Sequence, residues 1–128
     1  MLFLRFRWFG IFLLALSVSL LSLVMDQVLN KGSIIQTLNS HRRELVDFGV
    51  ERIGLFGSYY KDKMRSESDI DFLVEIQEDK KTFRNFMALA YFLEDLFNKK
   101  VDLVTPQSLS PHIGPHILKS VEYVSFVD

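Results

Sequence analysis

The feature that most limits how this chain can fold is a regular alternation of helix-like and strand-like segments after residue 33. Apolar residues recur at helical spacing from residue 33 to 48, where Ser33 can cap the start of a helix and Gly49 can end it. Strands are predicted over residues 50–56, 70–76 and 101–104, and a last extended piece over 122–127. A short helix or turn is predicted over 58–64, and helices over 82–97 and 115–120. This order predicts one α/β (α+β) domain, a small sheet backed by helices.

The predicted helix over residues 82–97 carries more apolar side chains than one sheet face needs. Thr82 opens it, and one stripe comprises Phe83, Phe86, Met87, Ala90, Leu93 and Phe97, with Leu89, Phe92 and Leu96 widening it. We expect part of this surplus to contact a partner.

Length and composition limit the possible functions. The chain has 128 residues, of which 48% are hydrophobic, enough for one domain with a single core. Its formal net charge of -1 gives none of the basic excess of a nucleic-acid-binding domain, so no direct nucleic-acid binding is expected. The absence of cysteine excludes disulfides, zinc–thiolate sites and a thiol nucleophile, so any metal must be held by oxygen or imidazole.

Residues 1–24 form a separate hydrophobic segment. Arg5 and Arg7 precede an uncharged run from residue 8 to 24, close to the lower limit for a membrane span, and no convincing signal-peptide cleavage site precedes Met25. Three interpretations are open: a membrane anchor, a cleaved signal, or translated upstream sequence before a start at Met25. We expect residues 25–128 to form the functional domain and the protein to be cytoplasmic, with membrane anchoring through residues 8–24 as the alternative.

A strand that ends in Gly57 and Ser58 is the first candidate for a binding site. Backbone N–H groups at the start of the following helix, together with the Ser58 hydroxyl, can bind a phosphate, and glycine allows a close approach. A Gly-Ser pair also ends many strands simply to make a turn, so this signal alone is weak.

Three aspartates strengthen the case for a catalytic site. Asp69 and Asp71 lie two apart at the start of a strand, so both are expected on one face, where repulsion at ~5 Å and an effective dielectric near 20 costs about 3 kcal/mol. A divalent cation such as Mg²⁺ would compensate. The alternative is that both are solvated turn and edge residues. Asp102 favours the metal site, because an aspartate inside the short strand 101–104 needs a partner and can also serve as a general base.

With these residues the chain resembles the minimal nucleotidyltransferases of the polymerase-beta-like superfamily. The resemblance rests on Gly57-Ser58, ten intervening residues, Asp69-Ile70-Asp71, and a later Asp102 within Val-Asp-Leu-Val, and it extends from residue 33 to the C-terminus. It implies a mixed sheet, three aspartates as Mg²⁺ ligands and catalytic residues, and Gly57 and Ser58 as the grip on the phosphates of an NTP.

The resemblance also implies a partner and a reaction. Small free-standing members of this family are typically antitoxins encoded beside a HEPN-domain ribonuclease toxin. The expected activity is therefore protein adenylylation, the transfer of AMP from ATP to a tyrosine of the toxin, within a hetero-oligomer of the two proteins. The alternative is a catalytically weak or inactive antitoxin that neutralises the toxin by binding alone. Transfer to a small molecule or to RNA is the weaker option, because it normally needs an extra substrate domain.

Two positions depart from the family pattern. Where the family has an arginine or similar base and then a glycine, this chain has Lys61 and Asp62. Lys61 can bind a phosphate as a point charge but lacks the two-pronged geometry of arginine. Asp62 would repel a triphosphate unless it points to solvent. His112 and His116 have ligand spacing, but the neighbouring prolines and glycine favour a surface loop, and no role is assigned to them.

Overall fold

The computed structural model describes residues 29–127 and confirms the predicted order of elements. The helices are α2 (Lys31–Ser40), α3 (Arg42–Asp47), α4 (Gly57–Lys61), α5 (Phe83–Phe97) and α6 (Gly114–Lys119). The strands are β1 (Val50–Phe56), β2 (Ile70–Ile76), β3 (Val101–Val104) and β4 (Glu122–Ser125), and the short 3-10 turns are η2 (Glu78–Lys80) and η3 (Pro106–Ser108).

The four strands form one mixed sheet in the order β3-β2-β1-β4. β1 is antiparallel to both β2 and β4, whereas β2 and β3 run parallel and are joined through α5. The mixed sheet implied by the resemblance is thus confirmed. β3 pairs only with residues 70–73 of β2, which leaves this edge of β2 from Val74 to Ile76 without a neighbouring strand.

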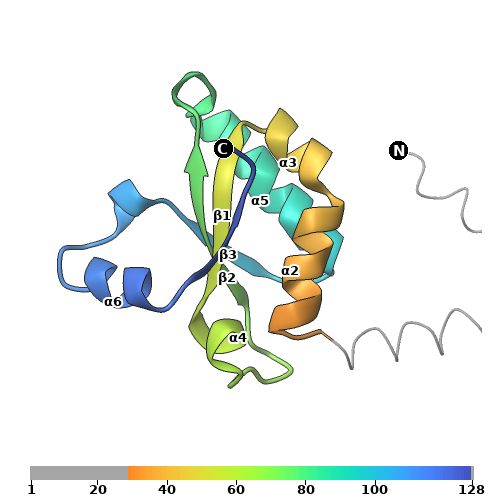
Figure 1. The fold of residues 1–128 in the computed structure, drawn as a ribbon, viewed down its shortest axis with the longest axis vertical. Helices are drawn as coiled ribbons and strands as arrows, with labels where there is room; N and C mark the ends of the chain where they lie inside the picture. The colour runs from red at the N-terminus through yellow and green to blue at the C-terminus, as the bar shows by residue number, and fades with distance from the viewer. Residues whose placement is uncertain (1–28, 128) are drawn as a thin grey trace, which may run out of the picture.

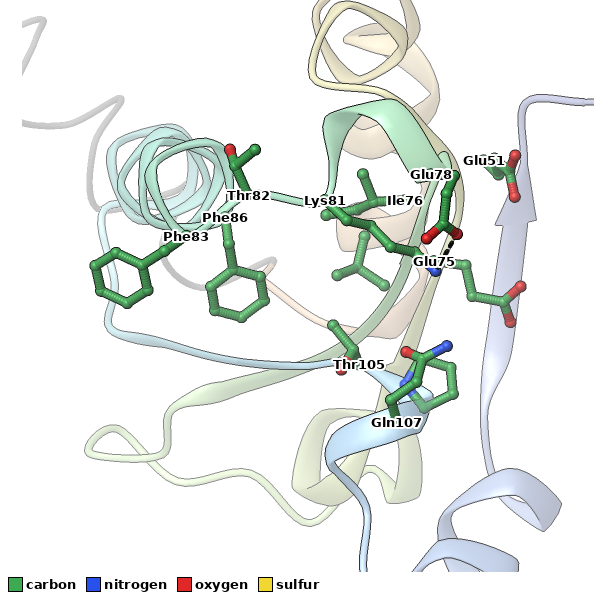
Figure 2. A pocket seen from close by; sticks show the side chains of 12 residues that line it. Glu51, Glu75, Ile76, Glu78, Lys81, Thr82, Phe83, Phe86, Thr105 and Gln107 are labelled. Carbon is green, nitrogen blue, oxygen red and sulfur yellow. Dashed lines mark hydrogen bonds and ion pairs between the residues drawn. The ribbon is translucent and has the colours of Figure 1, made fainter.

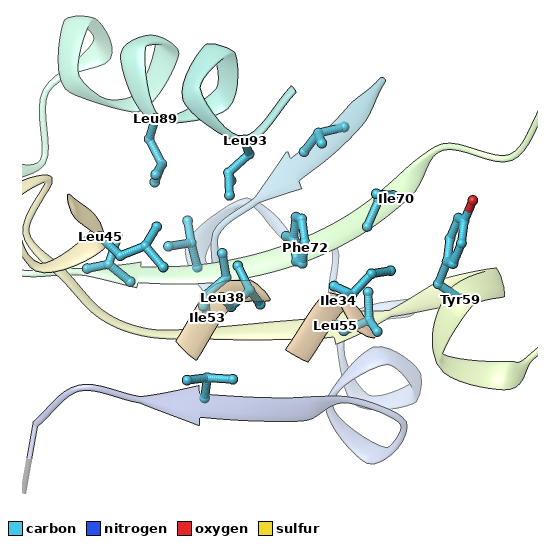
Figure 3. Close-up of a cluster of buried hydrophobic side chains, with 14 of the residues drawn as sticks. Ile34, Leu38, Leu45, Ile53, Leu55, Tyr59, Ile70, Phe72, Leu89 and Leu93 are labelled. Atoms are coloured by element: carbon cyan, nitrogen blue, oxygen red, sulfur yellow. The ribbon is translucent and has the colours of Figure 1, made fainter. Parts of the chain in front are cut away.

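The main hydrophobic core lies between the sheet and one layer of helices. Helices α2, α3 and α5 cover one side of the sheet, and α6 lies on the opposite side (Figure 1). Figure 3 shows Leu89 and Leu93 of α5 pointing toward the sheet that carries Phe72, and these side chains are fully buried together with Leu38 and Leu45. Burial of each such side chain stabilises the fold by about 1.5–3 kcal/mol, so this layer fixes the strands on which the candidate site stands.

The helix predicted over residues 33–48 is broken into α2 and α3. His41, with φ -108° and ψ 28°, departs from helical geometry between them. The N-cap is Asn30 and not Ser33, which instead completes a capping box as the third residue of α2. The predicted end at Gly49 is confirmed, since this residue has a φ of +85°.

The predicted start of α5 is confirmed, but the position of Phe83 is not. The Thr82 hydroxyl accepts a hydrogen bond from the backbone N–H of Asn85 at 3.1 Å, as a helix cap does. Phe83, expected on the core stripe, is 80% exposed, because the first turn of α5 faces an open cavity at the end of the sheet (Figure 2). The buried stripe of α5 is centred on Leu89 and Leu93.

None of the helices within residues 29–127 combines the length and apolar character needed to cross a membrane. The hydrophobic segment over residues 1–24 lies outside the described residues, and its three interpretations remain predictions.

Candidate functional site

The parallel pairing of β2 and β3 brings two of the three predicted catalytic aspartates together. Asp71 and Asp102 are direct partners in the strand register, and Phe56, the last residue of β1, is the partner of Asp71 on its other side. Asp69 lies one residue before β2 and is exposed. Asp102 is also exposed, so its presence in β3 carries less desolvation cost than a buried strand position would.

Gly57 lies directly against the Asp71 carboxylate. Its φ of +75° is in the left-handed region that favours glycine, and a Cβ built on it would collide with the Asp71 carboxylate oxygen Oδ2. Only glycine fits here for two reasons: the backbone is left-handed, and a side chain would collide with the Asp71 carboxylate. A Gly-Ser pair that only made a turn would require the left-handed backbone but not the absence of a side chain.

The environment of Asp71 disfavours its charged form. Partial burial is the largest cause, followed by the negative charges of Asp102 and Asp69 and a hydrogen bond with the Asp102 carboxyl, and together they raise the pKa of Asp71 from 3.8 to about 6. Such a raised pKa at clustered carboxylates is a common property of functional sites.

No cationic side chain within residues 29–127 forms an ion pair with these carboxylates. The ion pairs of this region join Lys31 to Glu122, Arg52 to Glu75, and Lys81 to Glu78. The oxygens of the paired carboxylates Asp71 and Asp102 fit a Mg²⁺ ion, which usually binds through one or two carboxylates and completes its shell with water and substrate phosphates.

A preformed three-ligand metal site is absent from the described part of the chain. No group of three or more His, Asp or Glu side chains there lies close enough to hold a metal ion. Asp71 and Asp102 fit the two-carboxylate arrangement, and the assignment of Asp69 as a third ligand stays a prediction.

A cavity of about 360 Å³ lies beside Gly57. Its lining residues are Phe56, Gly57, Lys61, His116, Ile117 and Ser120. The structure thus brings together Gly57 and Lys61, two of the three residues predicted to bind the nucleotide. Ser58 is half-buried and does not line this cavity, so its role in phosphate binding remains a prediction.

The sequence interpretation missed His116 as a cavity residue. The helix predicted over residues 115–120 is confirmed as α6, which includes His116, whereas the surface loop expected around the two histidines holds only for His112, in the preceding turn. Pro115 lies in the first turn of α6, where proline is well tolerated, so it is no argument against a helix that contains His116.

Asp62 occupies the position where a glycine suits the backbone. It has φ 60° and ψ 37°, a left-handed conformation at the C-terminal end of α4, and it is exposed. Glycine adopts this conformation without steric cost, and aspartate tolerates it better than most residues. Asp62 is expected to repel a bound triphosphate unless it points to solvent, and its exposed position satisfies that condition.

A larger cavity of the described residues lies away from the carboxylates. It measures about 670 Å³ and lies beyond the end of β3, where η3 follows. Figure 2 shows Phe83 and Phe86 of α5 on one side of it and Thr105 and Gln107 on another, with the Glu78–Lys81 ion pair between α5 and the sheet. Its mixture of exposed aromatic and paired charged side chains suits a contact face better than a metal-dependent active site.

Comparisons with known proteins identify the family of this fold. The family model of the nucleotidyltransferase domain matches residues 36–124. The protein adenylyltransferase MntA of Thermococcus cleftensis is 38% identical over 98 residues, covering 76% of this chain and 98% of that protein. A protein of Methanocaldococcus jannaschii, named as a candidate protein adenylyltransferase, is 37% identical and covers 71% of this chain and 90% of its own length.

Solved structures give the same result. A structure described as a candidate minimal nucleotidyltransferase superposes with a TM-score of 0.58 at 28% identity, covering 69% of this chain and 93% of that one. A toxin–antitoxin crystal structure with AMP-PNP superposes with a TM-score of 0.55 at 27% identity, covering 74% of this chain and 72% of that one.

Proposed function

Since this chain belongs to the nucleotidyltransferase domain family, we propose that it transfers AMP from ATP to a tyrosine of a cognate HEPN ribonuclease toxin and thereby neutralises the toxin. The observation that carries the proposal is the Asp71–Asp102 pair beside Gly57, a glycine whose Cβ would collide with the Asp71 carboxylate. The relative named as a protein adenylyltransferase and the toxin–antitoxin structure with AMP-PNP support the choice of acceptor and nucleotide.

The proposed reaction is an in-line substitution at the α-phosphorus of ATP. The phenolic oxygen of the tyrosine forms a bond to the α-phosphorus, the bond from that phosphorus to the oxygen bridging to the β-phosphate breaks, and diphosphate leaves. The phenolic proton passes to a base. Asp102 is the proposed base, and its exposure and its pairing with Asp71 in the strand register support this choice.

The remaining residues position the nucleotide. Asp71, Asp102 and Asp69 are the proposed Mg²⁺ ligands, and Gly57, Ser58 and Lys61 are the proposed phosphate-binding residues. Mg²⁺, when bound, neutralises charge on the phosphate oxygens. The chain's own contribution would be to hold the acceptor and the phosphates at the end of the sheet where the carboxylates and Gly57 meet.

The test is an intact-mass measurement. The full-length chain is incubated with ATP, Mg²⁺ and the cognate toxin, and the variant Asp69→Asn, Asp71→Asn serves as the matched control, because it removes two charges with little change in shape. The expected result is a toxin heavier by one or more AMP units with the native chain and unchanged with the variant. A toxin that stays unmodified with the native chain contradicts the proposal.

A second candidate function is neutralisation by binding alone. Two exposed aromatic side chains of α5, Phe83 at 80% and Tyr91 at 60%, favour it, because they give this helix an apolar face that no other described element covers. A stable complex with an unmodified toxin in the same experiment would select this function over transfer.

The proposed partners and location follow from the reaction. The chain would act in the cytoplasm, where ATP and Mg²⁺ are available, as a hetero-oligomer with the toxin and without direct contact to nucleic acid. Membrane anchoring would require residues 1–24 to be part of the working protein.

A further inference from the structure

The cavity between α4 and α6 contains a second basic side chain whose position no sequence motif predicts. We propose that His116 of α6 binds the β- and γ-phosphates of the nucleotide together with Lys61 of α4. This inference rests on the proposed function in one respect, that the site binds ATP.

The lining of the cavity suits an anion. Lys61, His116 and Ser120 contribute side-chain hydrogen-bond donors, and no carboxylate is among the lining residues. The side chains of Lys61 and His116 are exposed, and neither takes part in a hydrogen bond or ion pair within residues 29–127. Both are therefore available to a ligand without breaking an existing interaction.

The position of the cavity matches the reaction. Gly57 lines the cavity and also lies against the Asp71 carboxylate, so a ligand in the cavity is adjacent to the carboxylate pair. A nucleotide whose α-phosphorus reacts beside Asp71 and Asp102 would place its remaining phosphates there. A volume of about 360 Å³ lies within the usual range of small-molecule sites, about 300–1,000 Å³.

Lys61 and His116 together would then supply the two phosphate contacts that a single arginine can make at the position of Lys61 in the family pattern. Lys61 acts as a point charge and lacks a planar pair of donors. His116 approaches from a separate helix and adds an N–H donor at a fixed ring position, so the pair can contact two phosphate oxygens from two directions. His116 would thus provide the second phosphate contact that Lys61 alone cannot make.

The test compares binding of AMP-PNP and of AMP to the full-length chain by calorimetry. His116→Ala is the variant, and His112→Ala is the matched control, because His112 is exposed, lies four residues away and does not line the cavity. We expect His116→Ala to weaken AMP-PNP binding about tenfold or more, as loss of a hydrogen bond to a charged group does, and to leave AMP binding unchanged. His116→Lys should restore AMP-PNP binding, and His112→Ala should change neither ligand.

Three results overturn the inference: unchanged AMP-PNP binding by His116→Ala, an equal loss for AMP-PNP and AMP, or no binding of AMP-PNP by the native chain. Binding of AMP-PNP that depends on His116, together with an unmodified toxin, supports the inference and contradicts only the proposed transfer.

Discussion

Replacing Asp71 with asparagine should stabilise the protein at neutral pH, although it removes a proposed catalytic residue. The structure raises the pKa of this carboxyl from 3.8 to about 6, mainly by burial and by the charge of Asp102. Between these two values the folded state binds more protons than the unfolded state, so the free energy of unfolding falls as the pH rises. A pKa difference of this size corresponds to at most about 3 kcal/mol of stability lost by pH 7. Because the side chain is only partly buried, solvent screening lowers the expected loss to about 1–2 kcal/mol.

An asparagine at this position carries no charge at any pH, so it loses no stability as the pH rises from about 4 to 7. We therefore expect Asp71→Asn to exceed the native chain by about 1–2 kcal/mol at pH 7.5, and the two to be nearly equal at pH 4, below the raised pKa. Urea unfolding of the full-length chain, with EDTA present to remove divalent cations, measures the difference at each pH.

The control is Asp95→Asn, which removes a carboxyl from the exposed surface of α5, outside the carboxylate pair. A stability difference between Asp71→Asn and the native chain that stays the same from pH 4 to pH 7.5 would refute the reasoning, because a raised pKa requires the difference to grow with pH. With Mg²⁺ in place of EDTA, the native chain should gain stability and the variant should gain less.

Further predictions concern the glycine, the left-handed aspartate, the exposed aromatic residue and the core. Gly57→Ala combines a positive φ with a collision against the Asp71 carboxylate, so urea unfolding should show a loss of about 1–3 kcal/mol and AMP-PNP binding should fall; an unchanged midpoint would contradict the geometry. Asp62→Gly relieves a left-handed residue at the entropic cost of a glycine, so a thermal melt should show a gain of less than about 1 kcal/mol, and a lower melting temperature would count against this account. Phe83→Ser should change the free energy of unfolding by less than about 0.5 kcal/mol while weakening the toxin complex in a titration; equal toxin affinity would exclude this end of α5 as a contact. Leu93→Ala should cost about 2–5 kcal/mol in urea unfolding, and a smaller loss would mean that the core beneath α5 collapses around the gap.

The strands could be predicted from sequence because their composition and ends are distinct. Gly49 and Gly57 flank β1, residues 70–76 are rich in side chains that suit a sheet, and the structure has both strands at the predicted residues. The break at His41 could not be predicted, because nothing in the apolar spacing interrupts there: Ile34 and Leu38 on one side and Leu45 on the other continue one helical pattern, and all are buried.

The candidate site was only partly accessible to sequence reasoning. The spacing of Gly57, Asp71 and Asp102 in the chain indicated the chemistry, but the contact between glycine and carboxylate depends on how β1 pairs with β2, which no local pattern encodes. Phe83 was misplaced, and His116 was missed as a cavity residue, for a similar reason. Helical periodicity states which face a side chain occupies, and it does not state whether a strand or another helix extends far enough to meet that face.

The short third strand affects how copies of this protein meet one another. Beyond Leu73 the backbone edge of β2 has no strand beside it, and such edges are where sheets of separate molecules join and aggregate. Pro106 follows almost at once, and Glu75, Glu78 and Lys81 surround the opening with charge. Intermolecular strand addition at this edge would have to bury those charges, so the residues that line the cavity beside α5 also oppose pairing of this edge with the sheet of another molecule.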